Sequence, residues 1–192
     1  MTDATTGTRE FQGLQIPLAG TYVLDAAHNR IGFVARHLMV SKVRGNFGVA
    51  TATITVGEDP LQSSVTATIQ TESIFTGQPD RDKHLRTGDF FEVAKYPTIE
   101  YRSTGIKSFD GNEIVLQGDL TIKGITKPVD LLVEFEGAGR SPYGQDVFGF
   151  SATAEIDRED WGLNWNVALE SGGVLIGKKV KIEIEGEAIR QA

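Results

Sequence analysis

Apolar and polar residues alternate along most of this chain, which is the pattern of β-strands with one buried face. Near the C-terminal end, Val180, Ile182 and Ile184 fall on one face of such a strand, and Lys181 and Glu183 fall on the other. The same alternation covers residues 21–25, 31–40, 43–56, 64–71, 98–107, 113–123, 128–137 and 147–156. Gly, Asp and Asn cluster between many of these segments, which indicates turns. The pattern predicts an all-β protein whose strands close as a sandwich or a barrel, with either a filled core or a cavity.

One segment has helical character, "PDRDKHLRTGDFFEV" at residues 79–93. Asp80 can cap a first turn and Gly88 can end it, and Asp89 followed by Glu92 resembles a second capping box. We therefore expect a short helical insertion near residues 80–93. No linker or repeat divides the chain, so we expect one β-domain over residues 20–190 behind a flexible N-terminal tail at residues 1–19.

Composition excludes several functions. The 192 residues contain no Cys, which removes disulfides, thiol catalysis and iron–sulfur clusters, and the three His leave little room for a zinc site. Nineteen Lys and Arg against 26 Asp and Glu give a net charge of −7, which argues against nucleic-acid binding. No segment approaches the roughly 20 apolar residues of a membrane span, and none resembles a signal peptide. We expect a cytoplasmic protein without stable membrane insertion, and no cofactor or metal.

A basic segment stands out against this acidic total. Residues 26–57 contain no Asp or Glu, but they carry Arg30, Arg36, Lys42, Arg44 and two of the three His. Such a segment is a candidate anion site, because Arg offers a fork of donors that matches phosphate. The alternative is that these side chains pair with acids from the other half of the chain.

Two further clusters concern the interior. His37 shares the parity of Ile31, Phe33 and Ala35, so we expect it to point inward, either as a core residue or as a ligand contact. The charged turn that carries Arg81, His84 and Arg86 is flanked by Phe75, Phe90 and Phe91, an arrangement that can close an apolar opening with cations at its rim. Trp161 and Trp165 are interpreted as core residues or plugs at a barrel end.

Enzyme signatures are largely absent. The chain has no phosphate-binding glycine loop, no G-x-S-x-G elbow and no H-E-x-x-H. Asp25 and His28 can form an Asp–His pair, but no nucleophile stands at a spacing that requires one. A metal held by His28, His37 and His84 lacks a ligand spacing that would support it.

Four motifs in order resemble the YceI-like family over residues 20–188. The family's Asp-x-x-His, followed by alternating apolar residues and a second His, falls on Asp25, His28, Ile31, Phe33 and His37. Its other motifs are Arg-Asp-x-His-Leu at residues 81–85, Asp-Phe-Phe at 89–91, and Lys-Gly-x-Thr-Lys-Pro at 123–128; "ATAEIDREDWGLNWN" at 152–166 also carries the likeness. The chain departs from the family at Asn29 and Arg30, which favours a more basic mouth, and in lacking the export signal of many relatives.

The resemblance implies an extended antiparallel lipocalin-like β-barrel of about eight strands around a long apolar pore. It also implies a non-enzymatic carrier for a polyisoprenoid, an isoprenoid quinone precursor or a fatty-acyl amphiphile, and it allows a homodimer. The residues expected along the apolar tail of the ligand are Phe33, Phe47, Phe75, Phe90, Phe91, Phe148, Phe150 and Leu163. Those expected at its polar head group are Arg36, His37, Arg81, His84 and Arg86.

Two alternatives stay open from the sequence. The first is an enzyme that acts on an isoprenoid or quinone head group with His28 or His37 as acid–base. The second is a structural or stress-linked interaction protein whose barrel is filled by its own side chains.

Overall fold

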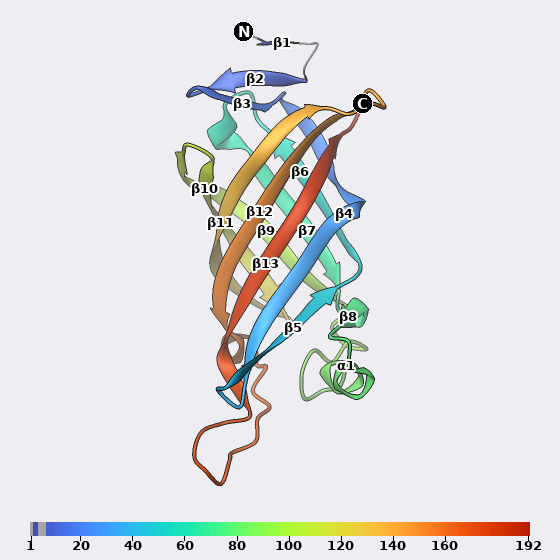
Figure 1. Ribbon diagram of the computed structural model, residues 1–192, viewed down its shortest axis with the longest axis vertical. Coiled ribbons are helices and arrows are strands. Elements are labelled where there is room, and N and C mark those ends of the chain that lie inside the picture. The colour runs from blue at the N-terminus through green and yellow to red at the C-terminus, as the bar shows by residue number, and fades with distance from the viewer. Residues whose placement is uncertain (1, 4–6) are drawn as a thin grey trace.

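A closed antiparallel barrel dominates the computed structural model, which describes residues 2–3 and 7–192 (Figure 1). Its strands are β4 (Gly20–His37), β5 (Ser41–Phe47), β6 (Ala50–Val56), β7 (Ser64–Gln70), β8 (Ile74–Phe75), β9 (Thr98–Asp110), β10 (Glu113–Ile122), β11 (Ile125–Arg140), β12 (Asp146–Asp157) and β13 (Ile176–Arg190). In the described residues, eight of them complete the ring in the order β4, β6, β7, β9, β10, β11, β12, β13, and β13 pairs back to β4. The expected all-β barrel of about eight strands is confirmed.

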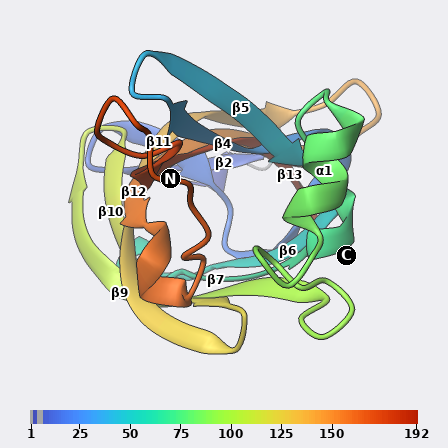
Figure 2. The ribbon, with the colours of Figure 1, turned by 90° about the horizontal axis from the view of Figure 1, so that it is seen from below.

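The two ends of the barrel differ. At one end, called the hairpin end, β2 (Thr8–Phe11) and β3 (Leu14–Pro17) lie across the strands, with β1 (Thr2–Asp3) beyond them (Figure 1). The other end, called the α1 end, carries the helix α1 (Pro79–Leu85), the β4–β5 turn and residues 162–175 (Figures 1 and 2). Short 3-10 turns lie at η1 (Pro60–Gln62), η2 (Thr71–Ser73) and η3 (Arg158–Trp161). No helix in the described residues is long and apolar enough to cross a bilayer.

Strand β4 is one continuous element, although alternation predicted separate strands at residues 21–25 and 31–40. Its pairing with β13 slips by a bulge: Asn29 faces Gly186 and Leu24 faces Ala188, so residues 25–28 stand opposite Glu187 alone. A bulge interrupts the alternation without ending the strand, which is why the sequence pattern breaks there. β4 then ends at His37, because the next two residues adopt positive φ and turn the chain into β5.

The segment predicted as one strand at residues 43–56 is divided into β5 and β6. β5 pairs with the part of β4 nearest the α1 end, from Ile31 to His37, whereas β6 pairs with its opposite end, from Gly20 to Val23. The two short strands thus flank the same side of β4 in succession, and residues 48–49 connect them. The inward side chains fall at odd positions in β5, such as Val43 and Phe47, but at even positions in β6, such as Ala50 and Ile54. The alternation therefore changes phase at residues 48–49, which a single strand over residues 43–56 does not allow.

The expected flexible tail at residues 1–19 is wrong for residues 8–17, which form the β2–β3 hairpin. Thr8, Ile16 and Pro17 are buried, because the hairpin packs against β11 and β12. Residues 1 and 4–6 of that predicted tail lie outside the described residues. Strands of four residues carry too short a pattern to be separated from a polar tail by alternation.

The helical insertion is shorter than predicted. α1 spans Pro79–Leu85, and residues 86–95 follow as turns rather than as a second helix. Its N-cap is Gln78 instead of Asp80: the Gln78 side chain accepts hydrogen bonds from the backbone N–H groups of Asp80 and Arg81, and Pro79 occupies the first helical position.

Candidate ligand cavity

A cavity of about 670 Å³ runs inside the barrel from one end to the other. Its lining reaches Ile16, Pro17 and Val56 at the hairpin end, and His84 and Leu163 at the α1 end. Such a volume lies in the range of cavities that hold small ligands. The barrel is therefore not filled by its own side chains.

The wall of this cavity is apolar because the predicted inward faces of the strands point into it. The aromatic and aliphatic residues that line it include Phe33, Phe47, Phe90, Phe91, Phe148, Phe150 and Leu163, which are seven of the eight predicted tail contacts. The long strands contribute Ile114, Leu116, Leu120, Val129, Leu131, Val133, Phe135, Val180, Ile182 and Ile184. Whether these residues contact a bound chain stays a prediction.

Phe75, the eighth predicted tail contact, is the exception, because the structure places it outside the cavity. Its side chain is 59% exposed, and it does not belong to the lining. The neighbouring Ile74 is fully buried and takes the inward position of the two-residue strand β8. A strand this short provides no alternation from which the inward residue could be chosen.

Polar side chains of the lining concentrate at the α1 end. Arg36, His37, Asp80, Arg81, His84 and Arg158 line the cavity there. Arg36, Asp80 and Arg81 are exposed, so the cavity reaches solvent at this end. Figure 2 looks along the barrel from this side and shows α1 beside the ring of strands, with the segment after η3 crossing it.

Arg81 and His84 are both partly engaged by the protein. Arg81 Nε donates to Thr76 Oγ1 over 2.7 Å and Nη2 to the Thr76 carbonyl over 3.1 Å, which orients its guanidinium. His84 Nε2 lies 2.8 Å from Asp89 Oδ2, and its ring packs edge-on against Trp165 and Phe90, with centroids 4.6 and 5.1 Å apart. These contacts hold both side chains at the rim.

Arg86, which was predicted to contact the head group, does not line the cavity. Its Nε donates to the Glu72 carbonyl and its Nη2 to the Ile74 carbonyl, both over 2.9 Å, and it forms an ion pair with the Glu72 carboxylate. Arg86 is the C-cap of α1, where the chain turns away from the cavity and the side chain fastens the segment before the helix.

Arg158 is a cavity residue that sequence reasoning missed. It is buried, and its guanidinium donates to the backbone carbonyls of Gly177, Leu163, Trp165 and Ile176. Within the described chain no carboxylate forms an ion pair with it, and burial lowers the pKa of Arg158. Its acidic sequence neighbours made it resemble a surface residue, so charge patterning gave no signal of its burial.

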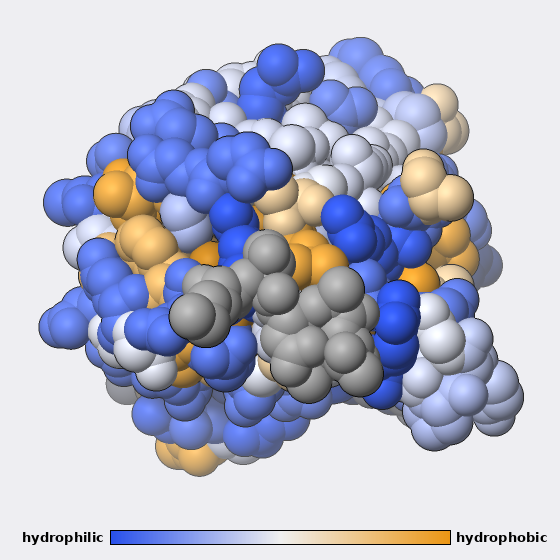
Figure 3. All heavy atoms as spheres, turned by 90° about the horizontal axis from the view of Figure 1, so that it is seen from above, coloured by the Kyte–Doolittle hydropathy of each residue, from blue (hydrophilic) through white to orange (hydrophobic). Residues whose placement is uncertain are grey.

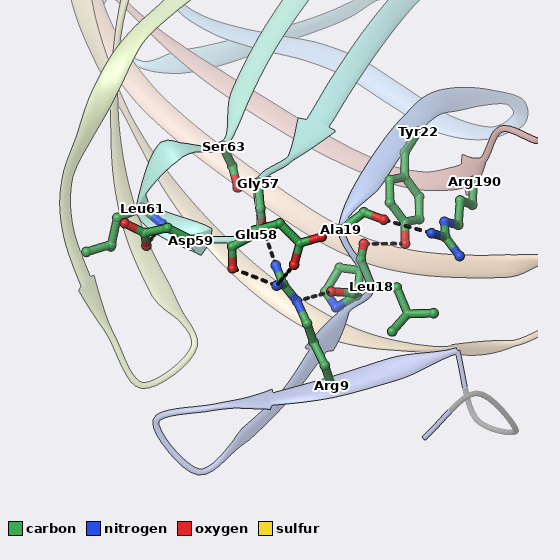
Figure 4. A network of polar contacts seen from close by, with 11 residues as sticks. Arg9, Leu18, Ala19, Tyr22, Gly57, Glu58, Asp59, Leu61, Ser63 and Arg190 are labelled. Carbon is green, nitrogen blue, oxygen red and sulfur yellow. Dashed lines mark hydrogen bonds and ion pairs between the residues drawn. The ribbon is translucent and has the colours of Figure 1, made fainter. Parts of the chain in front are cut away.

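Side-chain contacts fasten the β2–β3 hairpin across the hairpin end (Figure 4). Arg9 Nη1 donates to the Glu58 carbonyl over 2.7 Å, Nη2 donates to the Gly57 carbonyl, and Nε donates to the Pro17 carbonyl over 3.2 Å. Phe11 packs edge-on against Phe109 of β9, with ring centroids 5.3 Å apart. Seen from above, this end is mostly hydrophilic with a few apolar residues near its centre (Figure 3).

Asp25 and His28 form the expected pair, but outside the cavity. His28 Nδ1 shares a 2.5 Å hydrogen bond with Asp25 Oδ2, which raises the pKa of His28 and lowers that of Asp25. With Glu187, which faces the bulge, they bring three metal-ligand atoms within 4.8 Å of one another. Among the described residues no such group joins the three histidines.

A closed antiparallel barrel around an elongated apolar cavity defines the class of lipocalin-like binding barrels. The chain belongs to one family of this class, because residues 22–188 match the YceI-like domain. A UPF0312 protein of Staphylococcus aureus is 41% identical over 168 residues, which are 86% of this chain and 95% of the relative. The resemblance predicted from the motifs is confirmed.

Solved structures show the same architecture. The YCEI protein of Campylobacter jejuni is 28% identical, with a TM-score of 0.69 over 82% of this chain and 90% of that one. BcnA of Burkholderia cenocepacia is 21% identical, with a TM-score of 0.73 over 85% and 98%. A polyisoprenoid-binding domain from Saccharophagus degradans is 16% identical, with a TM-score of 0.66 over 91% and 100%. The last two likenesses concern the fold alone.

Proposed function

We propose that this protein carries a long apolar chain along the axis of its barrel, with the polar head group of the ligand at the α1 end. One observation supports this most strongly: an apolar cavity extends between the two ends of the barrel, and the charged residues that line it lie at the α1 end. An amphiphile with one long tail and one polar head matches that distribution.

The apolar wall supplies enough energy for such a ligand. Burying about ten methylene groups contributes roughly 8 kcal/mol before the costs of association. Those costs leave an affinity on the order of micromolar from the tail alone. The head group then sets the orientation of the ligand more than its affinity.

Two sources support an isoprenoid as the tail. The barrel shares its fold with the polyisoprenoid-binding domain of Saccharophagus degradans, and a branched apolar tail suits a wall of aromatic and aliphatic side chains. The cationic groups Arg36, His37 and Arg81 favour an anionic head such as a diphosphate or carboxylate.

The placement of the histidines supports a carrier role without catalysis. His28 lies outside the cavity, with its side chain 69% exposed. His37 lines the cavity, but in the described part of the chain no carboxylate is hydrogen-bonded to its ring, as a general base would need for orientation.

Native mass spectrometry of the freshly purified protein, followed by solvent extraction, tests this function. We expect a non-covalent adduct with an isoprenoid or fatty-chain mass, or uptake of added prenyl diphosphates. Phe33→Asp should lose the adduct, because it places a charge in the cavity wall. Ala67→Phe should reduce the adduct without adding charge, because the larger side chain fills part of the cavity. Phe75→Asp is the matched control, because that ring lies outside the cavity.

Circular dichroism confirms that each variant is folded. Absence of any adduct or uptake in the folded unmodified protein would contradict the proposal, and so would equal loading of Phe33→Asp and Phe75→Asp.

A further inference from the structure

The α1 end carries an exposed apolar surface beside the cavity. Leu38, Met39 and Val40 form the β4–β5 turn, and their exposed fractions are 38%, 59% and 80%. Val167, in the segment that precedes β13, is 44% exposed. We call these four residues the apolar tip.

Backbone contacts hold the apolar tip as one surface. The Leu38 N–H donates to the Leu175 carbonyl over 2.8 Å, and the Leu175 N–H donates to the Val167 carbonyl over 2.9 Å. Leu38 and Met39 have φ of 52° and 60°, a region that Gly and Asn enter at lower cost than larger side chains. Neither burial nor backbone conformation therefore favours large apolar residues in this exposed turn, yet they occupy it.

Cations flank the same turn. Arg36 of β4 stands directly opposite Lys42 of β5, and Arg44 follows two residues later on the same face. All three are exposed, and in the described residues neither Arg36 nor Lys42 has an ion-pair partner. Like charges at directly opposed positions destabilise a strand pair, so an anionic surface that contacts both would relieve this repulsion.

We propose that the apolar tip docks on an anionic lipid bilayer, with its side chains at the boundary between head groups and acyl chains and the flanking cations on lipid phosphates. This inference rests on the proposed function, since Arg36 and His37 also line the cavity and place its mouth beside the tip. A chain could then pass between bilayer and barrel with little exposure to water.

The orientation of docking follows from the charge distribution. The net charge of −7 repels an anionic bilayer from most faces of the molecule. Glu170 lies exposed in the segment that carries Val167, so Arg36, Lys42 and Arg44 on the strand side of the tip must face the phosphates. Binding should therefore weaken as salt is raised.

Co-sedimentation with vesicles tests the inference. We expect the full chain to bind vesicles of phosphatidylcholine with phosphatidylglycerol more tightly than vesicles of phosphatidylcholine alone. Met39→Asp combined with Val40→Asp should weaken this binding on the order of tenfold or more, because two apolar side chains no longer enter the interface. Tyr143→Asp is the matched control, since Tyr143 is 89% exposed at the hairpin end.

Unchanged vesicle binding by the double variant would overturn the inference, and so would absence of binding by the unmodified protein, which would point to a protein partner for the tip. Uptake of a prenyl diphosphate from aqueous solution is measured in parallel. The double variant should retain this uptake but acquire the chain more slowly from vesicles. If no variant takes up a chain from either source, the proposed function itself fails.

Discussion

The arginines at the α1 end differ in how many of their N–H groups are hydrogen-bonded within the protein. Arg158 is held by four backbone carbonyls, and Arg81 by two oxygens of Thr76. Arg36 has no such partner within the described residues. Arg36 is therefore the arginine whose whole fork of donors remains for a ligand.

Replacing Arg36 with Gln should weaken a prenyl diphosphate more than the prenyl alcohol of equal length. Loss of one charge-assisted contact corresponds to about 1.5–3 kcal/mol, or roughly tenfold to a hundredfold in Kd. Fluorescence competition with both ligands measures the difference. Arg86→Gln serves as the control, because that side chain lies outside the cavity; equal losses for the two ligands in Arg36→Gln would place the head group elsewhere.

The buried contacts of Arg158 predict that this residue contributes to the stability of the fold. Arg158→Met should lower the free energy of unfolding by about 3 kcal/mol, because buried carbonyls lose a charged donor. Arg44→Met, at an exposed position, should stay within about 0.5 kcal/mol of the original. Urea unfolding compares the two, and similar stabilities would show that the carbonyl contacts of Arg158 are replaceable.

The Asp25–His28 pair predicts a pH dependence. Because the pKa of His28 is raised above its usual 6.5, the pair stabilises the fold fully below that value and less as pH rises through the raised pKa. The pKa of Asp25 is lowered, so the stabilisation by the pair is lost at acid pH, as the pH falls through that lowered value. Imidazole NMR should show the His28 pKa falling towards 6.5 in Asp25→Asn and shifting less in Glu187→Gln; an unchanged value in Asp25→Asn would contradict the pairing.

At the scale of elements, alternation predicted the inward faces of the long strands correctly, since strands of ten or more residues repeat the pattern several times. It did not predict the bulge at residues 25–28, the division of residues 43–56 or the β2–β3 hairpin. The bulge depends on Glu187 of β13, and the position of the hairpin depends on its packing against β11 and β12; both partners are distant in sequence. Arg9, for example, reaches Gly57 and Glu58, and no local pattern contains that information.

The hydrogen bonds of Arg9 predict how firmly the β2–β3 hairpin is held against the barrel. Arg9→Ala should expose the β2–β3 hairpin to limited proteolysis and to faster amide exchange at Ile16, because three backbone carbonyls lose their shared donor. Glu10→Ala, exposed on the same strand, is the matched control. Equal protection of Ile16 in both variants would mean that packing rather than Arg9 holds the hairpin.

At the scale of the whole molecule, closure of the barrel by β13 and β4 joins the two ends of the domain and creates the cavity. The sequence left a sandwich and a barrel open, and only the resemblance favoured the barrel, because closure is a property of the pairing between strands rather than of any one strand. Once the ring is closed, the inward alternation makes an apolar wall, and the arginines and histidines of the α1 end give it a polar mouth.

We expect one ligand chain to occupy this cavity with its head group at the α1 end. Paramagnetic NMR with spin-labelled fatty acids tests it most directly. A label at the methyl end should broaden the signals of Ile16 and Val56, and a label near the carboxylate those of Leu85 and Ile176. The reverse pattern would place the head group at the hairpin end, and broadening confined to exposed residues such as Val40 would show that the fatty acid binds outside the cavity.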